Sequence, residues 1–250
     1  MKNFKQKILK PIIEKTKNPR IGVITLSTDL TIEQDFRKIC NDLPLDIFFN
    51  RIPFINPLNH ENYLKMSEHL PQVSAQILPD QKIDVIAYGC TSGTIAIGEE
   101  QIKKQIHKSK PNALVTTPIT AALKGFKKLN FKKIAVLTPY PREVNLTVFN
   151  YLKQNNIEID SFNSFNLNYD YEIAQVSLDS MMNQISKINL SNIDGLFVSC
   201  TALKIVDIIG NIEKEFKTNV VSSNQAIIWD CLKLLKIKNE VLGYGNLFRS

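Results

Sequence analysis

The fold of this chain is decided by IDVIAYGCTSGT at residues 83–94, whose pattern returns as IDGLFVSCTAL at residues 193–203. In both segments Ile-Asp comes first, an apolar run follows, and Cys-Thr stands in the same register. A second pair, RIGVITLSTD at 20–29 and KIAVLTPYPR at 133–142, repeats at nearly the same spacing. Two matched pairs at one spacing indicate that the chain consists of two related halves.

Each repeated segment has the composition of a buried parallel strand. Short apolar runs lie at 21–26, 85–88, 134–138 and 196–199, with further short strands expected at 114–117 and 220–223. Amphipathic helices are expected between them, and Thr31 and Gln34 stand where a capping box would begin the first one. Strands that alternate with helices predict an α/β fold of two pseudo-symmetric, doubly wound parallel-sheet lobes with the active site between them.

The two halves set the expected domain limits. We expect the first lobe at residues 18–117 and the second at 118–223, each of the size that one small domain needs. The C-terminal helix, within 224–248, is expected to pack back on the first lobe, because no room remains after it for another strand and helix.

The composition of the 250 residues is globular, with 44% hydrophobic and 22% charged residues. The net charge is +7, but the lysines are spread along the chain, and the densest run, at 124–133, is typical of a solvated helix face. We therefore expect no nucleic-acid partner. Every apolar run is far shorter than the ~20 residues that span a bilayer, so no membrane partner is expected. The basic start lacks the features of a secretory signal, which makes a cytoplasmic location the expectation.

The four cysteines have no close pairs, so the sequence predicts neither a disulfide framework nor a CxxC metal site. The three histidines share no ligand spacing with a cysteine and are expected at the surface, and no metal is expected. Cys40 and Cys231 stand at apolar helix positions, where a free cysteine packs in the core, and Trp229 is expected in the core as well.

Cys90 and Cys200 differ from the other two cysteines because each follows a repeated strand. Ligands of open parallel sheets bind beyond the carboxyl ends of the strands. The start of the next helix is expected to favour a thiolate and an anionic ligand there. Two thiols that flank one cleft could remove a proton on one face of a carbon and return one on the other. A redox disulfide between them is a further interpretation.

Other polar residues follow the same strand ends and are candidates for substrate binding. Each of them, taken alone, is also typical of a turn or a helix cap. The candidates are Thr91, Ser92 and Thr201 beside the thiols, Asp29 and Tyr140 after the paired strands, and Asn166 and Asn224 after later apolar runs.

These strings together resemble the aspartate/glutamate racemase superfamily, and within it the branch of maleate cis–trans isomerases and arylmalonate decarboxylases. The resemblance covers about residues 18–248 and rests on TLSTDLTIEQDF, DVIAYGCTSGT, TTPITAAL, LTPY, SFN, VSCTAL and SSNQA. Within the branch these strings are most similar to ectoine-utilisation proteins. The resemblance implies a cofactor-independent enzyme with a small carboxylate substrate; it leaves open whether the chain is a homo-oligomer.

The resemblance also implies roles for single residues. Cys90 matches the cysteine that acts as nucleophile or base, and Cys200 matches the acid. The carboxylate-binding hydroxyls of the decarboxylases match Thr91, Ser92 and Tyr140. The binding asparagine of the isomerase matches Asn166, with Asn163 and Asn168 as alternatives.

One position departs from the branch. Asp29 stands where the maleate isomerase has an asparagine that holds a substrate carboxylate, and an ionised aspartate would repel that group. A substrate with an amine or amidine suits Asp29 better. The expected function is therefore isomerisation or racemisation of a small amino- or hydroxy-carboxylate. A decarboxylase of the arylmalonate type and a non-catalytic two-lobed ligand-binding protein remain as alternatives.

Overall fold

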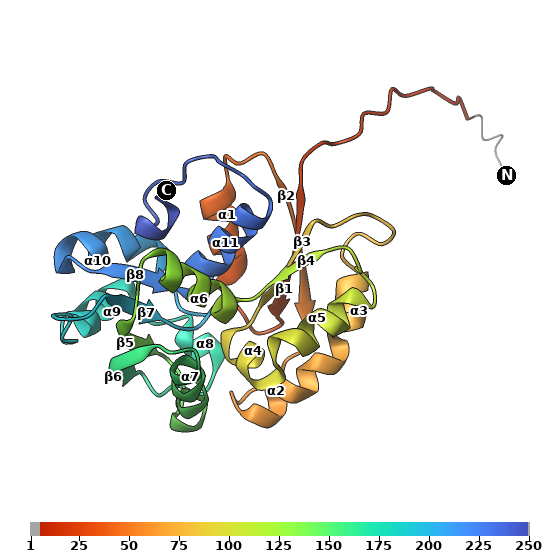
Figure 1. The fold of residues 1–250 in the computed structure, drawn as a ribbon. Coiled ribbons are helices and arrows are strands. Elements are labelled where there is room, and N and C mark those ends of the chain that lie inside the picture. Colours follow the sequence, from red (N-terminus) through yellow and green to blue (C-terminus); the bar gives the residue numbers. More distant parts are fainter. Residues whose placement is uncertain (1–5, 250) are drawn as a thin grey trace.

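Two four-stranded parallel sheets form the framework of the computed structural model, which describes residues 6–249 (Figure 1). The first sheet has the order β2-β1-β3-β4 and the second has the order β6-β5-β7-β8. Both sheets therefore have the same topology, which is what a duplicated sequence requires. The strands are β1 Arg20–Leu26, β2 Asp46–Ile52, β3 Val85–Gly89, β4 Leu114–Thr116, β5 Lys133–Thr138, β6 Glu158–Ser164, β7 Gly195–Val198 and β8 Asn219–Ser222.

The four strands with the repeated sequences, β1, β3, β5 and β7, lie inside the sheets. Nearly every residue of these strands is buried, because helices cover both faces of a parallel sheet. The edge strands β2 and β6 are only partly buried, which agrees with their more polar sequences. The expected α/β fold with two related lobes is confirmed.

Helices connect the strands and surround both sheets (Figure 1). Single turns of 3-10 helix lie at Ser67–His69, Val206–Ile208 and Asn246–Phe248. The α-helices are α1 Ile32–Cys40, α2 His60–Met66, α3 Leu70–Ala75, α4 Thr91–Ile97, α5 Glu99–His107, α6 Pro118–Lys128, α7 Arg142–Gln154, α8 Asp170–Ile173, α9 Leu178–Ile185, α10 Ile209–Phe216 and α11 Ser223–Leu234.

Helices α6 and α11 each follow the last strand of one sheet and pack against the other sheet. Helix α6 contacts β8, and the ring of Phe126 meets that of Phe197 in β7 with centroids 5.2 Å apart. Helix α11 contacts β3, β4 and α1 of the first half, as expected for the C-terminal helix. The residue limits 18–117 and 118–223 stay predictions.

The two exchanged helices also pack against each other, and a buried carboxylate joins them. Asp230 of α11 accepts hydrogen bonds from the Thr116 hydroxyl at 2.6 Å and from the Lys124 ammonium at 2.5 Å. Because Asp230 is buried, its charge is stabilised only by these partners. The network ties the end of β4, helix α6 and helix α11 into one interface.

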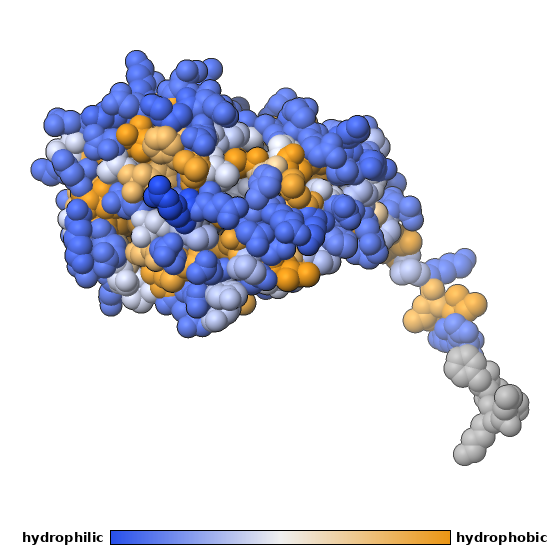
Figure 2. Space-filling model, turned by 90° about the horizontal axis from the view of Figure 1, so that it is seen from below, coloured by the Kyte–Doolittle hydropathy of each residue, from blue (hydrophilic) through white to orange (hydrophobic). Residues whose placement is uncertain are grey.

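Residues 6–18 have no helix or strand and extend away from the two lobes (Figure 1). Four apolar side chains, those of Ile8, Leu9, Ile12 and Ile13, are exposed there, and Figure 2 shows apolar atoms gathered on this arm. Of the helices described, none has the length and apolar character needed to cross a membrane.

Candidate active site

Both repeated cysteines lie at the end of an inner strand, as the sequence predicts. Cys90 follows β3 and is the N-cap residue of α4, where its Sγ accepts a hydrogen bond from the Gly93 N–H at 3.2 Å. A side chain at Gly93 would place its Cβ 2.7 Å from that sulfur, so the glycine makes room for the thiol. Cys200 follows β7, and its Sγ accepts a hydrogen bond from the Ala202 N–H at 3.4 Å.

The backbone at Cys200 adopts φ 116°, in the region that side chains rarely occupy. Such a conformation costs about 1–3 kcal/mol and persists only where neighbouring contacts hold it. The Cys200 N–H donates to Ser223 Oγ at 3.0 Å, and the Thr91 hydroxyl donates to the same Oγ at 2.9 Å. Ser223, the first residue of α11, therefore holds the backbone of Cys200 and also the hydroxyl of Thr91, the residue that follows Cys90.

The two thiols line the same cavity from opposite lobes. Its volume is only about 10 Å³, the space of about one water molecule, so the cleft is closed and must open for a substrate to enter. The residues that line it are Leu26, Asp29, Leu58, Tyr63, Cys90, Thr91, Ser92, Tyr140, Asp170, Cys200 and Thr201.

Asp29 lies in this cavity and also begins helix α1. Its Oδ1 accepts hydrogen bonds from the N–H groups of Thr31 at 2.7 Å and Ile32 at 2.9 Å. The predicted capping box with Thr31 is therefore wrong, because Asp29 already occupies the free N–H groups. The Thr31 hydroxyl instead donates to the carbonyl of Ala202 at 2.9 Å and joins the two lobes.

A second carboxylate, that of Asp170, faces the same cavity, and sequence reasoning missed it. Asp170 is the first residue of the short helix α8, and its Oδ2 accepts a hydrogen bond from the Thr28 hydroxyl. Burial raises the pKa of Asp29 to about 6 and also raises the pKa of Asp170. Asp170 follows no apolar strand in the sequence, so strand-end reasoning could not find it.

The environment of the thiols differs from the sequence expectation. Burial raises the pKa of Cys90 to about 12 and that of Cys200 well above its ordinary value, and the charge of Asp170 raises both further. The N–H groups of Gly93 and Ala202 lower these pKa values but do not outweigh burial. In the closed cleft burial therefore favours neutral thiols, contrary to the thiolates expected from the sequence.

Two tyrosine hydroxyls complete the cavity. Tyr140 follows β5, as the sequence predicts, and lies beside Cys200. Tyr63, on α2, was not predicted; it is buried, stacks on Phe54 at 5.4 Å between ring centroids, and its hydroxyl lacks a hydrogen-bond partner among the described residues. A buried hydroxyl without a partner is costly, and a polar ligand in the cavity would satisfy it.

The structure brings Thr91, Ser92 and Thr201 into the cavity wall, as the sequence predicts. Asn224 stands just behind that wall, where its Nδ2 donates to Asp35 Oδ2 at 2.7 Å and to the carbonyl of Thr201 at 2.8 Å. Its position indicates that it supports Thr201 and not the substrate directly.

The structure does not bring Asn166 to the cleft. Asn166 is exposed, adopts a left-handed φ of 56°, and lines a separate surface groove with Arg142 and Phe149. The chain leaves edge strand β6 just before it and turns outward. Asn163, an alternative, donates its Nδ2 to the carbonyl of Val136 at 3.2 Å and does not line the cavity either.

The remaining candidates have ordinary structural positions. Cys40 and Cys231 are buried, and Trp229 is only 7% exposed. The three histidines, at positions 60, 69 and 107, are exposed. Within residues 6–249 no group of three or more His, Cys, Asp or Glu side chains is arranged to hold a metal ion.

Comparisons with known proteins agree on one family. The family model described as arylmalonate decarboxylase matches residues 54–248. A maleate isomerase of Nocardia farcinica is 23% identical over 240 residues, which cover 92% of this chain and 95% of that protein.

Two solved structures share the fold. One is a maleate isomerase from Pseudomonas putida S16, with a TM-score of 0.85 at 20% identity, and the match covers 93% of this chain and 98% of that one. The other is a cysteine-to-serine mutant of the Nocardia farcinica maleate cis–trans isomerase with a covalently bound succinylcysteine intermediate. Its TM-score is 0.85 at 21% identity, and the match covers 92% of this chain and 98% of that one.

Proposed function

The chain belongs to the arylmalonate decarboxylase family, in the branch that this family shares with the maleate isomerases, and we propose that it is a cofactor-independent isomerase or racemase of a small carboxylate. Cys90 and Cys200 are the catalytic pair. The observation that carries the proposal is that the two thiols line one closed cavity, each from its own lobe. The cysteine-bound intermediate of the Nocardia farcinica isomerase supports cysteine chemistry in this fold.

The reaction needs two groups that act on opposite faces of one carbon. The sulfur of one cysteine, as thiolate, removes the proton next to the substrate carboxylate, and the electron pair of the C–H bond moves onto the carboxylate. The thiol of the other cysteine then gives its proton to the opposite face, which leaves that sulfur as the thiolate. The hydroxyls of Ser92 and Tyr140, which line the cavity, donate hydrogen bonds to the negative oxygens that form in between, whereas the Thr91 hydroxyl donates to Ser223 and positions that wall of the cavity.

The charge of the cavity favours a substrate that also carries a cation. Asp29 and Asp170 both line the cavity, whereas none of its lining residues is a lysine, arginine or histidine. A dicarboxylate such as maleate would meet two buried carboxylates with no cation to offset them, which is unfavourable. An amino- or amidino-carboxylate would place its cation beside them.

Such a cation would also help to form the thiolate. The charges of Asp29 and Asp170 raise the pKa of both thiols, so a bound ammonium or amidinium that offsets these charges lowers it again. Without substrate the two thiols then stay protonated and unreactive, and the bound substrate lowers the pKa of the thiol that acts as the base. Ectoine is an amidine with a carboxylate, and a role in the use of ectoine or hydroxyectoine belongs to the proposal.

The test is a screen of small carboxylates for exchange of the proton next to the carboxylate with deuterium from solvent, followed by NMR. We expect exchange with an amino- or amidino-carboxylate, and we expect turnover, measured as inversion at the same carbon, to fall at least about a hundredfold in Cys90→Ser and Cys200→Ser. Cys40→Ala removes a thiol that does not line the cavity and is the matched control. Near-normal turnover in either serine variant would refute the two-thiol mechanism.

The screen also separates the two alternatives. A decarboxylase of the arylmalonate type would release carbon dioxide from a malonate derivative and would need only one of the two thiols. A ligand-binding protein without catalysis would bind a carboxylate and exchange no proton with either thiol present.

A further inference from the structure

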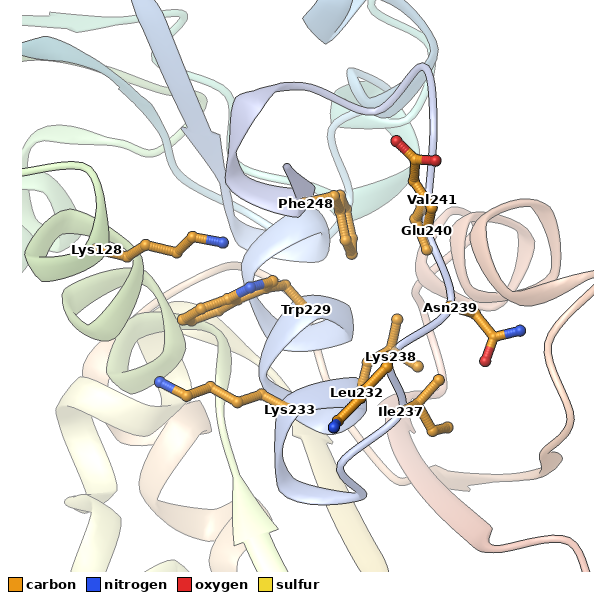
Figure 3. Close-up of a pocket in the computed structure, with 10 residues that line it drawn as sticks. All are labelled: Lys128, Trp229, Leu232, Lys233, Ile237, Lys238, Asn239, Glu240, Val241 and Phe248. Atoms are coloured by element: carbon orange, nitrogen blue, oxygen red, sulfur yellow. The ribbon is translucent and has the colours of Figure 1, made fainter. Parts of the chain in front are cut away.

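A second cavity opens between helix α6, helix α11 and the C-terminal segment (Figure 3). Its volume of about 680 Å³ falls within the range of about 300–1,000 Å³ that is usual for small-molecule sites. It is much larger than the closed cleft and shares no lining residue with it. The proposed reaction does not use this space.

One part of the cavity wall is apolar. Leu232 of α11, Ile237, Val241 and Phe248 line it together with the ring of Trp229. Figure 3 shows these side chains around one open space, contributed by α11 and by the chain that follows it. An apolar group of a ligand would lose water contact on this wall, which is favourable.

The other part of the wall is cationic. Lys128 of α6, Lys233 of α11 and Lys238 all line the cavity, against a single carboxylate, that of Glu240. Among the residues that the structure describes, these three lysines form none of the salt bridges. The lining residues therefore carry three positive charges against one negative charge, which leaves an excess of positive charge.

Two of these ammonium groups lie against the ring of Trp229. Lys128 Nζ lies 5.5 Å and Lys233 Nζ 5.0 Å from the centre of the Trp229 ring, on either side of it in Figure 3. Lys128 Nζ also donates to the carbonyl of Leu247 at 2.9 Å, which fixes its position. Partial burial lowers the pKa of Lys128, and the positive charge of Lys233 lowers it further.

We propose that this cavity is a binding site for a small organic anion with an apolar body. The lysines that line the cavity, Lys128, Lys233 and Lys238, attract its negative group, and its apolar part lies against Leu232, Val241 and Phe248. Charge complementarity carries the assignment, because an anion offsets the excess of positive charge. The apolar wall distinguishes such a ligand from an inorganic ion.

Tryptophan fluorescence can report the binding of a ligand in this cavity. Trp229 is the single tryptophan of the chain and lies in the cavity wall, so fluorescence excited selectively at tryptophan comes from this site. The wild-type protein is titrated with octanoate, with 1-octanol as the apolar probe without charge and inorganic phosphate as the charge without an apolar body. We expect a saturable change with octanoate and a much weaker response to the other two.

The lysines are tested with Lys128→Gln/Lys233→Gln and the matched control Lys127→Gln, an exposed neighbour that does not line the cavity. We expect the Kd of octanoate to rise at least about tenfold in the double variant, because each charge-assisted hydrogen bond contributes a large share of the affinity. In the control we expect a change of less than about twofold, since Lys127 does not line the cavity and its charge is screened by salt over the longer distance.

Three results would overturn the proposal. The first is the lack of a saturable fluorescence change with octanoate in the wild-type protein. The second is an equal response to 1-octanol or to phosphate, which would indicate an apolar surface or a bare ion site. The third is an octanoate Kd that is the same in the double variant and in the control. Wild-type titrations decide the first two, so the proposal stays testable even if the double variant does not fold.

Discussion

The closed cleft leads to a prediction about the reactivity of its thiols. A thiol with a pKa of about 12, as burial gives Cys90, instead of the ordinary 9.0 holds about a thousandfold less thiolate at about pH 8. Because only the thiolate reacts with iodoacetamide, Cys90 of the empty enzyme should be alkylated at least about a thousandfold more slowly than free cysteine, and Cys200, whose pKa is also raised, should react slowly as well. The rate should rise about tenfold for each pH unit up to about pH 10.

The assay is alkylation over a series of pH values, with each modified cysteine identified by mass spectrometry of its peptide. The closed cavity slows access equally at every pH, so the criterion is the midpoint of the profile and not the rate alone. Cys40 and Cys231 are buried outside the cleft and serve as internal references. A midpoint at or below about pH 9 for Cys90 would refute the reasoning, because it would mean that burial does not control this thiol.

The variant Asp170→Asn tests the second cause of the raised pKa of the two cleft thiols, which is the negative charge of Asp170. The charge of Asp170 raises the pKa of both cleft thiols, although burial is the larger cause for each. Asp170→Asn should therefore speed alkylation of Cys90 and Cys200 at fixed pH by up to about tenfold. An unchanged rate at both cysteines would show that Asp170 does not act on them.

Three further predictions concern positions around the cleft and the lobe interface. Burial raises the pKa of Asp35 from 3.8 to about 7, so the folded state prefers the protonated form of this side chain and loses stability as the pH rises through about 7. The unfolding free energy of the wild-type protein should therefore fall between about pH 5 and pH 8, and Asp35→Asn should reduce that fall by about 2 kcal/mol in urea titrations. An unchanged fall would contradict this. Gly93→Ala would bring a Cβ to 2.7 Å from the sulfur of Cys90 and 2.9 Å from Cε of buried Met66, so turnover of the folded variant should fall at least about a hundredfold and the melting temperature should also fall. Wild-type turnover would show that the thiol tolerates displacement. Asp230→Ala leaves the buried hydroxyl of Thr116 without its acceptor and should lower the unfolding free energy by about 2–3 kcal/mol, with a loss below about 0.5 kcal/mol as the contrary result.

Much of the fold was predictable because the sequence pattern of the inner strands occurs twice in the chain. The paired apolar runs predicted the inner strands of both sheets, and the shared Cys-Thr placed Cys90 and Cys200 at corresponding strand ends. A strand end is a local property of the sequence, so the residues next to it could be found without the structure. The cytoplasmic location and the ectoine role stay predictions.

The remainder of the cleft depends on packing between distant segments. Tyr63 lies on α2, which packs against α4 of the same half, and Asp170 lies on α8 of the other half. Both are outside the repeated strings, so tertiary packing and not the local sequence brings them to the thiols. The pKa of a thiol depends on how much protein surrounds it, which no local pattern records. Asn166 shows the reverse case, in which a polar residue close to a strand end turns outward.

The crossing of α6 and α11 between the sheets has an evolutionary consequence. A half-length ancestor with this connectivity would have buried its last helix only against a second copy, as a swapped homodimer. A fusion of the two copies into one chain would keep that arrangement and make it independent of concentration. It would also free the two halves to diverge, so that a once symmetrical centre could acquire distinct carboxylates on its two sides.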